Sequence, residues 1–425
     1  MKSEDIKRLN FILYTSFRQF VKSPYGILTC YIHFFYNFLR HVFFTQHSSC
    51  NITKEILFIA PSSNNKKAVR TICDNLSQDS YEYWGDLNML PKRKVLLKSI
   101  CGLPTFQRLY NDSNEEDRAL IRYYYGYFMK TCGYYNVIDD ILKRSKNLKL
   151  IVMSNDHNVV NRCFIELAPK YGIETLYVQH ASITERFPPL HFTYSFLDGY
   201  ESYEKYKNIG DMRGWVFLTG SPRFDEMFQY KNATKQYDIG IALNMMDSCD
   251  KVIDLCRFIR DNITTSIIVR PHPRMGKLFN KDIFSKEGIN ISDSTQESSF
   301  SFLSKIKYMI ANESGIHLDA ALVGVPSLLY NFSDGEIKDW YSYIKNGLIS
   351  VCNSFDDIAE EIKKTRTNWT DMTRYYNAAF NTPYDGRIGE IIARVIKDDI
   401  LGNKHMSFIK SITDYKYDFY SIKQK

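Results

Sequence analysis

The sequence predicts an α/β fold with two doubly wound, Rossmann-like domains that face a cleft, preceded by an N-terminal helical extension. Three observations predict this class. Short apolar runs recur along the chain, each run ends in a polar turn, and a helical pattern follows most of these turns. A length of 425 residues suits two such domains better than one.

Composition excludes several classes of protein. The chain has 55 Lys and Arg residues against 48 Asp and Glu residues, and the resulting net charge of +7 is small and evenly spread. A nucleic-acid partner is therefore not expected. The nine cysteines are scattered, with neither a CxxC pair nor a His/Cys metal spacing. This usage is typical of reduced thiols in a cytoplasmic protein, and no metal site is expected.

Residues 1–50 are predicted to form aromatic and basic amphipathic helices. The stretch 23–39 carries no formal charge, but it is short for a membrane-spanning helix and contains several polar residues. We expect a helical pair on the inner face of the cytoplasmic membrane, with Lys and Arg on anionic headgroups. The alternative is an apolar helix packed on the first domain or on a partner subunit.

Residues 51–231 are predicted to form the first Rossmann-like domain, which would bind the acceptor. The apolar run 56–60 is followed by a polar turn and a helix, but the GxGxxG signature of dinucleotide binding is absent. Further strands are expected at 150–153, 175–178, 196–197 and 215–218. Polar clusters follow these strands, and in open α/β sheets ligands bind at that edge.

Three titratable residues fall on this edge. Asp156 and His157 follow one predicted strand, and His180 directly follows the next. We expect a catalytic role for them, with the His180 region acting as a general base toward an acceptor hydroxyl. The alternative is that they hydrogen-bond their own loops and hold the loop shape.

Residues 232–385 are predicted to form the second Rossmann-like domain, which would bind a nucleotide donor. Its expected strands are 238–243, 266–269, 289–291, 308–311 and 327–330. One strand ends at Arg270-Pro271-His272-Pro273-Arg274. The prolines stiffen this loop, and its cations and imidazole suit a phosphate. The alternative is a surface loop with solvated arginines.

A second turn, after the strand 308–311, reads Asn312-Glu313-Ser314-Gly315 and opens a helical pattern. Gly315 would let the backbone approach a ligand, and the first N–H groups of the helix would favour an anion. Glu313 could accept hydrogen bonds from ribose hydroxyls. The alternative is that Ser314 caps the helix and the glycine serves only the turn.

At these motifs the sequence resembles glycosyltransferases of the GT-B fold. It is most similar to those of bacterial capsule, lipopolysaccharide and teichoic-type polymer synthesis, including Kdo- and sialic-acid-type transferases and CDP-glycerol glycerophosphotransferases, and to UDP-N-acetylglucosamine 2-epimerases. The resemblance covers about residues 52–395. It rests on the order and spacing of short motifs: Gln179-His180, Thr219-Gly220-Ser221-Pro222-Arg223, Arg270-Pro271-His272-Pro273, Glu313-Ser314-Gly315 with Asp319-Ala320, and Gly324-Val325-Pro326-Ser327.

The resemblance implies roles for specific residues. Glu313, Ser314 and Gly315 would hold the ribose and phosphate of a donor. Arg270, His272 and Arg274 would contact phosphate, and the donor set further includes Ser221, Arg223 and Asp319. Asp319 stands where relatives carry a longer Glu, which weakens the expected ribose contact. The resemblance implies no bound metal and no cofactor, and it implies a crossing helix and a tail in residues 386–425.

The expected function is transfer of a sugar from a CMP-, UDP- or GDP-linked donor to a surface glycan or glycolipid. The cleft between the domains would hold donor and acceptor on opposite sides. The alternatives are a CDP-alditol phosphotransferase of teichoic-type polymers and a non-catalytic polysaccharide assembly protein. A nucleotide-sugar epimerase ranks below transfer, because it has no use for an N-terminal membrane patch.

Overall fold

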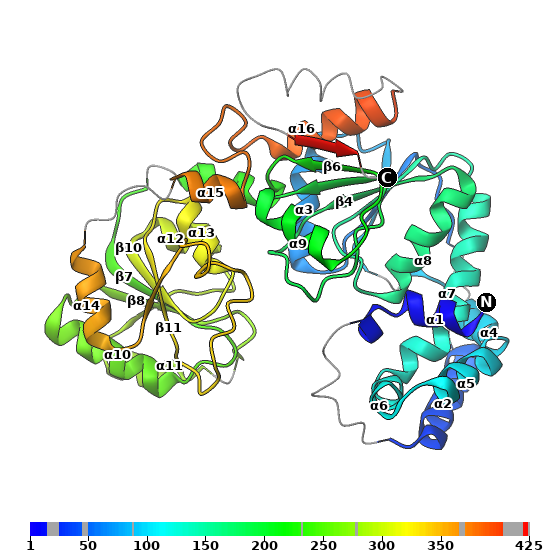
Figure 1. Cartoon of the computed structure of the whole chain (residues 1–425), viewed down its shortest axis with the longest axis horizontal. Coiled ribbons are helices and arrows are strands. Elements are labelled where there is room, and N and C mark those ends of the chain that lie inside the picture. The colour runs from blue at the N-terminus through cyan, green and yellow to red at the C-terminus, as the bar shows by residue number, and fades with distance from the viewer. Residues whose placement is uncertain are drawn as a thin grey trace. The chain divides into compact units, whose positions relative to one another are not determined.

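The computed structural model is shown in Figure 1. It describes residues 1–14, 25–44, 50–86, 89–230, 233–276, 279–364, 370–402 and 420–423. The chain divides into two compact units. Unit 1 comprises Met1–Leu197, Tyr203–Pro222 and Gly389–Lys425, and unit 2 comprises Asp198–Ser202 and Arg223–Ile388.

The elements up to the second unit alternate as the sequence predicts, with a helical insertion between β2 and β3. In chain order they are α1 (Ser3–Leu9), η1 (Phe11–Tyr14), α2 (Ile27–Phe44), β1 (Ile56–Ile59), α3 (Ser63–Asp74), β2 (Tyr81–Trp84), α4 (Lys92–Ile100), α5 (Leu103–Asp112), α6 (Glu115–Tyr123), α7 (Tyr125–Arg144), β3 (Leu150–Met153), α8 (Val159–Leu167), η4 (Ala168–Tyr171), β4 (Glu174–Val178), β5 (Tyr194–Leu197), α9 (Tyr200–Ile209) and β6 (Trp215–Leu218).

The sheet of unit 1 has the strand order β13-β6-β5-β4-β3-β1-β2. All neighbouring pairs from β2 to β6 are parallel, and only β13 (Tyr420–Lys423) pairs antiparallel, with β6. Strands β1 and β3 are completely buried, which explains their continuous apolar runs. The order 2-1-3-4-5-6 of the parallel strands is that of a doubly wound sheet whose direction reverses between β1 and β3.

The remaining elements build unit 2 and return to unit 1. They are η5 (Pro222–Tyr230), β7 (Tyr237–Ala242), α10 (Cys249–Asn262), β8 (Ile267–Arg270), α11 (Lys281–Lys286), β9 (Asn290–Ile291), α12 (Ser299–Ser304), β10 (Ile306–Ala311), α13 (Ile316–Leu322), β11 (Ser327–Tyr330), β12 (Ser350–Cys352), α14 (Phe355–Lys363), α15 (Thr370–Tyr376), α16 (Ile388–Arg394) and the π-helical turn η7 (Val395–Ile400).

The sheet of unit 2 is parallel throughout, with the order β12-β11-β10-β7-β8-β9. Numbered from β7 as the first strand, this is the order 3-2-1-4-5-6, and the winding reverses between β7 and β10. Both units are therefore doubly wound α/β sheets, and the predicted fold class is confirmed.

Alternation along β7 shows how this sheet is covered on both faces. Ile239 and Ile241 pack in one apolar cluster with residues of α10, α11 and α14. On the opposite face, Gly240 leaves room for α12, because a Cβ at this position would come within 2.8 Å of the Phe302 ring. The helices that flank the sheet can be followed in Figure 1.

The N-terminal helices differ in their surroundings. Ile6 and Leu9 of α1 are buried, and Ile6 packs in an apolar cluster with residues of α4 to α7, as the packed alternative expects. On α2, Cys30 and Phe34 are buried in the same cluster, while the opposite face of the helix is exposed. In the described ranges, no helix has both the length and the apolarity to cross a membrane. Most of the C-terminal tail, residues 403–419 and 424–425, lies outside the described residues.

A test of this packing concerns Gly133, where α7 approaches α4. A Cβ at this position would lie 2.1 Å from the Val95 carbonyl oxygen and 2.2 Å from Ser99 Oγ. We expect Gly133→Ala to lower the free energy of unfolding by about 2 kcal/mol, because the helices must separate. Gly126→Ala in the same helix is the control, since its Cβ would meet nothing closer than 3.9 Å. Equal urea midpoints for the two variants would contradict this packing.

Candidate functional site

The winding of the second sheet reverses at the polar turns that the sequence singles out. Residues 244–247 follow β7, and residues 312–315 follow the neighbouring strand β10. The loop 271–274 follows β8, on the other side of β7. Because the strands are parallel, all three loops lie at one edge of the sheet, and the ends of β8 and β10 are about 10 Å apart. Ligands of doubly wound sheets bind at such a reversal.

Asn312 connects the turns at this edge. Its amide nitrogen donates to Asp247 Oδ1 at 2.8 Å and to Asn331 Oδ1 at 3.3 Å, and its side-chain oxygen accepts from the Glu313 N–H at 2.7 Å. Asp247 Oδ2 also accepts from the Asn244 N–H at 2.7 Å. These hydrogen bonds join the ends of β7, β10 and β11.

His317 connects the Asn312 turn to the start of β11. It is fully buried, and its ring nitrogens lie 3.1 Å from Ser327 Oγ and 3.1 Å from the Asn312 carbonyl oxygen. Burial lowers the pKa of His317 to about 4, so the ring is neutral at neutral pH. Sequence reasoning assigned no separate role to Asn312, His317 or Asp247, because a single polar residue in or beside a turn carries no motif.

Glu313 is already engaged in this structure. Its carboxylate accepts from the backbone N–H of Lys338 at 2.9 Å and from the backbone N–H of Trp340. It therefore holds the loop after β11, where Asp339 and Ser342 have left-handed backbone angles (φ 48° and 57°). A ribose hydroxyl would have to share or replace these donors.

Gly315 is not demanded by the turn itself. Its φ of −61° is open to any residue, and a Cβ would meet nothing within 4 Å. It directly precedes α13 and has helical backbone angles itself, so the alternative in which Ser314 caps this helix remains open. Ser314 Oγ accepts a long 3.4 Å bond from the Ile316 N–H. The glycine leaves open space at the edge of the sheet.

Arg270 and Arg274 sit at the same loop but in different surroundings. The buried Arg270 guanidinium donates to Ser292 Oγ at 2.8 Å and to the Glu297 carbonyl at 2.7 Å, and it lies 3.9 Å from the Glu297 carboxylate. Arg274 is exposed, and its backbone N–H donates to His272 Nδ1 at 3.1 Å. Burial and the Arg274 charge lower the pKa of His272. Of the charged and imidazole groups of this loop, Arg274 is exposed and His272 half-buried, whereas Arg270 is buried.

Arg223 and Asp319 contact one another. Arg223 donates to Asp319 Oδ1 at 3.3 Å, lies 3.8 Å from an oxygen of Asp198, and stacks on Phe224 at 3.8 Å. Ser299 Oγ donates to the second oxygen of Asp319 at 3.1 Å. Both residues therefore have partners inside unit 2. Ser221 lies in unit 1, where its hydroxyl donates to the Gln179 carbonyl at 3.0 Å.

The candidate catalytic residues of unit 1 also gather at one edge of their sheet. Asp156 and His157 follow β3, one strand from β1, and His180 follows β4. His157 Nε2 lies 3.4 Å from Asp156 Oδ1, and the rings of His157 and His180 are 6.1 Å apart. The structure thus brings together all three residues that the sequence predicts.

The electrostatics of this cluster follow from burial. Burial raises the pKa of Asp156 to about 7, although Arg162 opposes the change. Burial, with the charges of His180 and Arg162, lowers the pKa of His157 to about 3. Near neutral pH the imidazole of His157 is uncharged, and any proton shared by the pair resides on the carboxyl group. Such a cluster can relay a proton without a strong ion pair.

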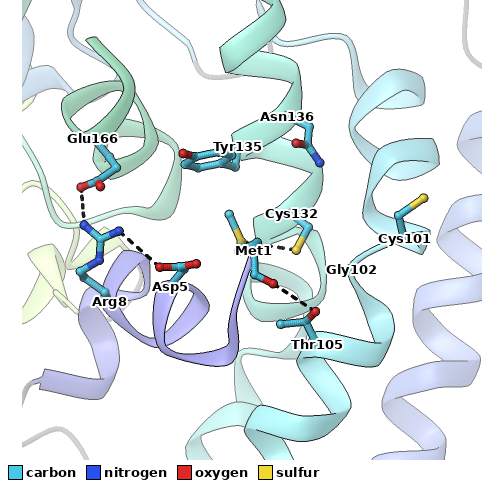
Figure 2. A pocket seen from close by; sticks show the side chains of 10 residues that line it. All are labelled: Met1, Asp5, Arg8, Cys101, Gly102, Thr105, Cys132, Tyr135, Asn136 and Glu166. Carbon is cyan, nitrogen blue, oxygen red and sulfur yellow. Dashed lines mark hydrogen bonds and ion pairs between the residues drawn. The ribbon is translucent and has the colours of Figure 1, made fainter. Parts of the chain in front are cut away.

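A separate polar cavity of about 490 Å³ lies beneath α1. Figure 2 shows its lining, with Arg8 paired to both Asp5 and Glu166 and with Met1 beside Cys132. None of the predicted site residues lines it. Over the described ranges, no three His, Cys, Asp or Glu side chains gather closely enough to hold a metal ion.

Comparison with known proteins finds similarity only among solved structures. No protein-family model and no curated protein matches the chain. The UDP-GlcNAc 2-epimerase of Methanocaldococcus jannaschii has a TM-score of 0.49 and 12% identity over 80% of this chain and 99% of its own. The S. aureus MnaA–UDP complex (0.47, 12%, 87% and 100%) and the wall teichoic acid polymerase TagF (0.47, 11%, 89% and 100%) are also similar. At these identities, the activity of this chain has to be argued from its own residues.

The two arginines of the loop after β8 provide a test of the site. Arg270→Ala would remove the buried guanidinium that donates to Ser292 Oγ and to the Glu297 carbonyl, and we expect the free energy of unfolding to fall by about 3 kcal/mol. Arg274→Ala is the matched control and should change stability by less than about 0.5 kcal/mol. Urea unfolding at constant pH measures both. A loss at Arg274 as large as that at Arg270 would show that the loop is built differently.

Proposed function

We propose that this chain is a glycosyltransferase that moves a sugar from a nucleotide-activated donor to a surface-glycan acceptor. The observation that carries the proposal is the position of the turn 312–315 at the reversal between β7 and β10. This is where doubly wound sheets bind nucleotides. The turn contains Gly315, which its backbone conformation does not require, and Arg274 and His272 lie at the same edge of the sheet.

In this proposal unit 2 binds the donor. Arg274 and His272 contact the phosphate oxygens, where a guanidinium forms strong charge-assisted bonds. Open space at Gly315 admits the phosphate or ribose close to the backbone. Glu313 exchanges the N–H groups of Lys338 and Trp340 for ribose hydroxyls. Arg270 keeps the loop in place and does not touch the donor, because its guanidinium is already satisfied.

The catalytic residues are those of unit 1. His180 accepts the proton of the acceptor hydroxyl as its oxygen attacks the anomeric carbon of the sugar. The bond from that carbon to the phosphate oxygen breaks, and the nucleotide leaves with the bonding electron pair. Asp156 and His157 hold the proton relay beside His180. The reaction as written needs no cofactor, and the nucleotide-sugar is a substrate.

A second candidate is a CDP-alditol phosphotransferase, and the loop after β8 favours it. His272 Nδ1 accepts from the backbone N–H of Arg274, and a loop that carries both an imidazole and a guanidinium suits reaction at phosphorus as well as phosphate binding. The acceptor oxygen would then attack the phosphorus next to the alditol, and CMP would leave. A non-catalytic assembly protein is the third candidate and requires no turnover.

Turnover of a donor panel distinguishes these functions. The protein is incubated with CMP-, UDP- and GDP-sugars and with CDP-glycerol and CDP-ribitol, and free nucleotide is measured with and without a glycan acceptor. We expect acceptor-dependent release from one sugar donor, and a drop of about 100-fold or more in His180→Ala. Gly315→Val and Arg274→Ala should weaken nucleotide binding about tenfold while Gly126→Ala does not.

Each other outcome selects a different reading. CMP release from a CDP-alditol alone supports the phosphotransferase, and an isomerised donor without acceptor supports an epimerase. The non-catalytic assembly protein is supported by two results together. No donor releases nucleotide, and cells that carry His180→Ala or Arg274→Ala produce as much polymer as the wild type.

We further propose that the acceptor is reached at the inner face of the cytoplasmic membrane, through the exposed face of α2. Large apolar side chains recur along this face at helical spacing, from Leu28 (71% exposed) to Phe43 (73% exposed). They are Leu28, Ile32, Phe35, Tyr36, Leu39 and Phe43. The exposed Arg40 and Lys92 lie close enough to His41 to lower its pKa, after the larger effect of burial. Cations beside an apolar stripe suit an anionic lipid surface.

Vesicle sedimentation tests this surface. The protein should bind vesicles with about a third anionic lipid at low salt, and less well vesicles of zwitterionic lipid. Ile32→Glu with Leu39→Glu should weaken binding at least tenfold, because two charges enter the lipid boundary. Met246→Glu is the control, since Met246 is 77% exposed in unit 2. Equal binding of both variants would show that α2 is not the contact surface.

A further inference from the structure

An aromatic residue from the N-terminal segment covers the catalytic cluster of unit 1. Phe11 of η1 is 8% exposed and stacks on the His157 imidazole, with ring centres 4.9 Å apart and planes at 29°. Phe187, from the loop after β4, meets the same ring edge-on at 4.4 Å and 89°. One aromatic ring thus covers a face of the imidazole and another meets it edge-on, while 24% of the His157 side chain remains exposed.

Phe11 is held by its neighbours in the chain and not by its own ring alone. The Asn10 amide donates to Thr131 Oγ1 of α7 at 3.0 Å and to the Ile6 carbonyl at 2.7 Å. Arg162 of α8 donates from Nε to the Arg8 carbonyl at 3.2 Å, and the Arg8 side chain pairs with Glu166 of α8, as Figure 2 shows. The segment α1–η1 is therefore fixed on both helices that flank β3.

We propose that Phe11 is a positioning residue of the catalytic cluster, because its ring shields the His157 imidazole from water and holds it toward Asp156. That the cluster is catalytic rests on the proposed function, whereas the shielding of His157 by Phe11 does not. A stacked aromatic ring favours one orientation of the imidazole and excludes solvent from one face. In that orientation Nε2 stays 3.4 Å from Asp156 Oδ1.

The protonation state of His157 reports on this shielding. The groups that act on it are Asp156 on its own loop, His180 after β4 and Arg162 on α8, while Arg8 of α1 is turned to Glu166. Glu185 and Arg186 precede Phe187 in the loop after β4. With a pKa of about 3 against an ordinary 6.5, the ring is neutral at neutral pH. Its burial costs stability progressively as the pH falls from about 6.5 to about 3, because the unfolded chain binds the proton first.

Histidine-selective NMR titration of the full chain tests the proposal without any substrate. The His157 signal is assigned by its absence in His157→Gln, and its pKa is measured in the wild type, Phe11→Ala and Phe11→Leu. We expect the wild-type ring not to titrate between pH 5 and 8. In Phe11→Ala water reaches the ring, and the pKa should rise by at least about one pH unit. Phe11→Leu should keep it low, because the space stays filled.

A second arm uses turnover of whichever donor the panel identifies. The pH profile of kcat for Phe11→Ala should gain an acid limb at the pH where His157 now titrates. Its kcat should fall about tenfold with little change in KM for the donor, and Phe11→Leu should restore most of the loss. A purely structural role would lower the amount of folded protein and leave the pH profile of the remainder unchanged.

The outcomes separate this inference from the proposed function. If no donor is turned over but the NMR change occurs as expected, the proposed function is wrong and the shielding of His157 by Phe11 is supported. A His157 pKa that rises by less than about one pH unit in folded Phe11→Ala overturns the inference even where the enzyme turns over. If Phe11→Ala does not fold, Phe11→Val is read by the same criteria.

Discussion

The parallel pairing of both sheets is the constraint on which the candidate site depends. In a parallel sheet every strand ends at the same edge, so polar turns far apart in sequence come to lie together there. The turns after β7, β8 and β10 meet in this way in unit 2, and those after β3 and β4 meet in unit 1. The order 3-2-1-4-5-6 adds the reversal of winding, and the turn 312–315 occupies it.

Hydrogen bonding within the edge then decides which polar groups remain for a ligand. Asn312 joins Asp247 to Asn331, Glu313 holds the loop after β11, and Arg270 is bound to Ser292 and Glu297. A buried charge without such partners would be costly, so these bonds are what allow the charged groups to be there at all. The cationic character of the edge is therefore smaller than the sequence suggests and is concentrated at the exposed Arg274, because the pKa of His272 is lowered.

The strands, their polar ends and the doubly wound class could be predicted from the sequence, because apolar runs and turn residues are local signals. The meeting of Asp156, His157 and His180 could also be predicted, since it follows from strand ends alone. The partners of Arg270, Asp319 and Arg223 could not, because they come from distant segments that no periodicity connects. Glu313 illustrates the same limit: its type suggested ribose, but its hydrogen bonds go to the backbone of another loop.

The aromatic N-terminal stretch shows why composition alone assigns too much to one role. Phe11 and the apolar residues of α2 look alike in the sequence, yet Phe11 is buried on a histidine and Phe43 faces outward. The two sites differ in the charged side chains that surround them. The exposed Arg40 and Lys92 lie near the end of α2 and depress the pKa of His41 beyond the effect of burial. A protein interface with an apolar core excludes such cations, whereas anionic headgroups attract them, and this difference is what the proposed lipid contact of α2 rests on.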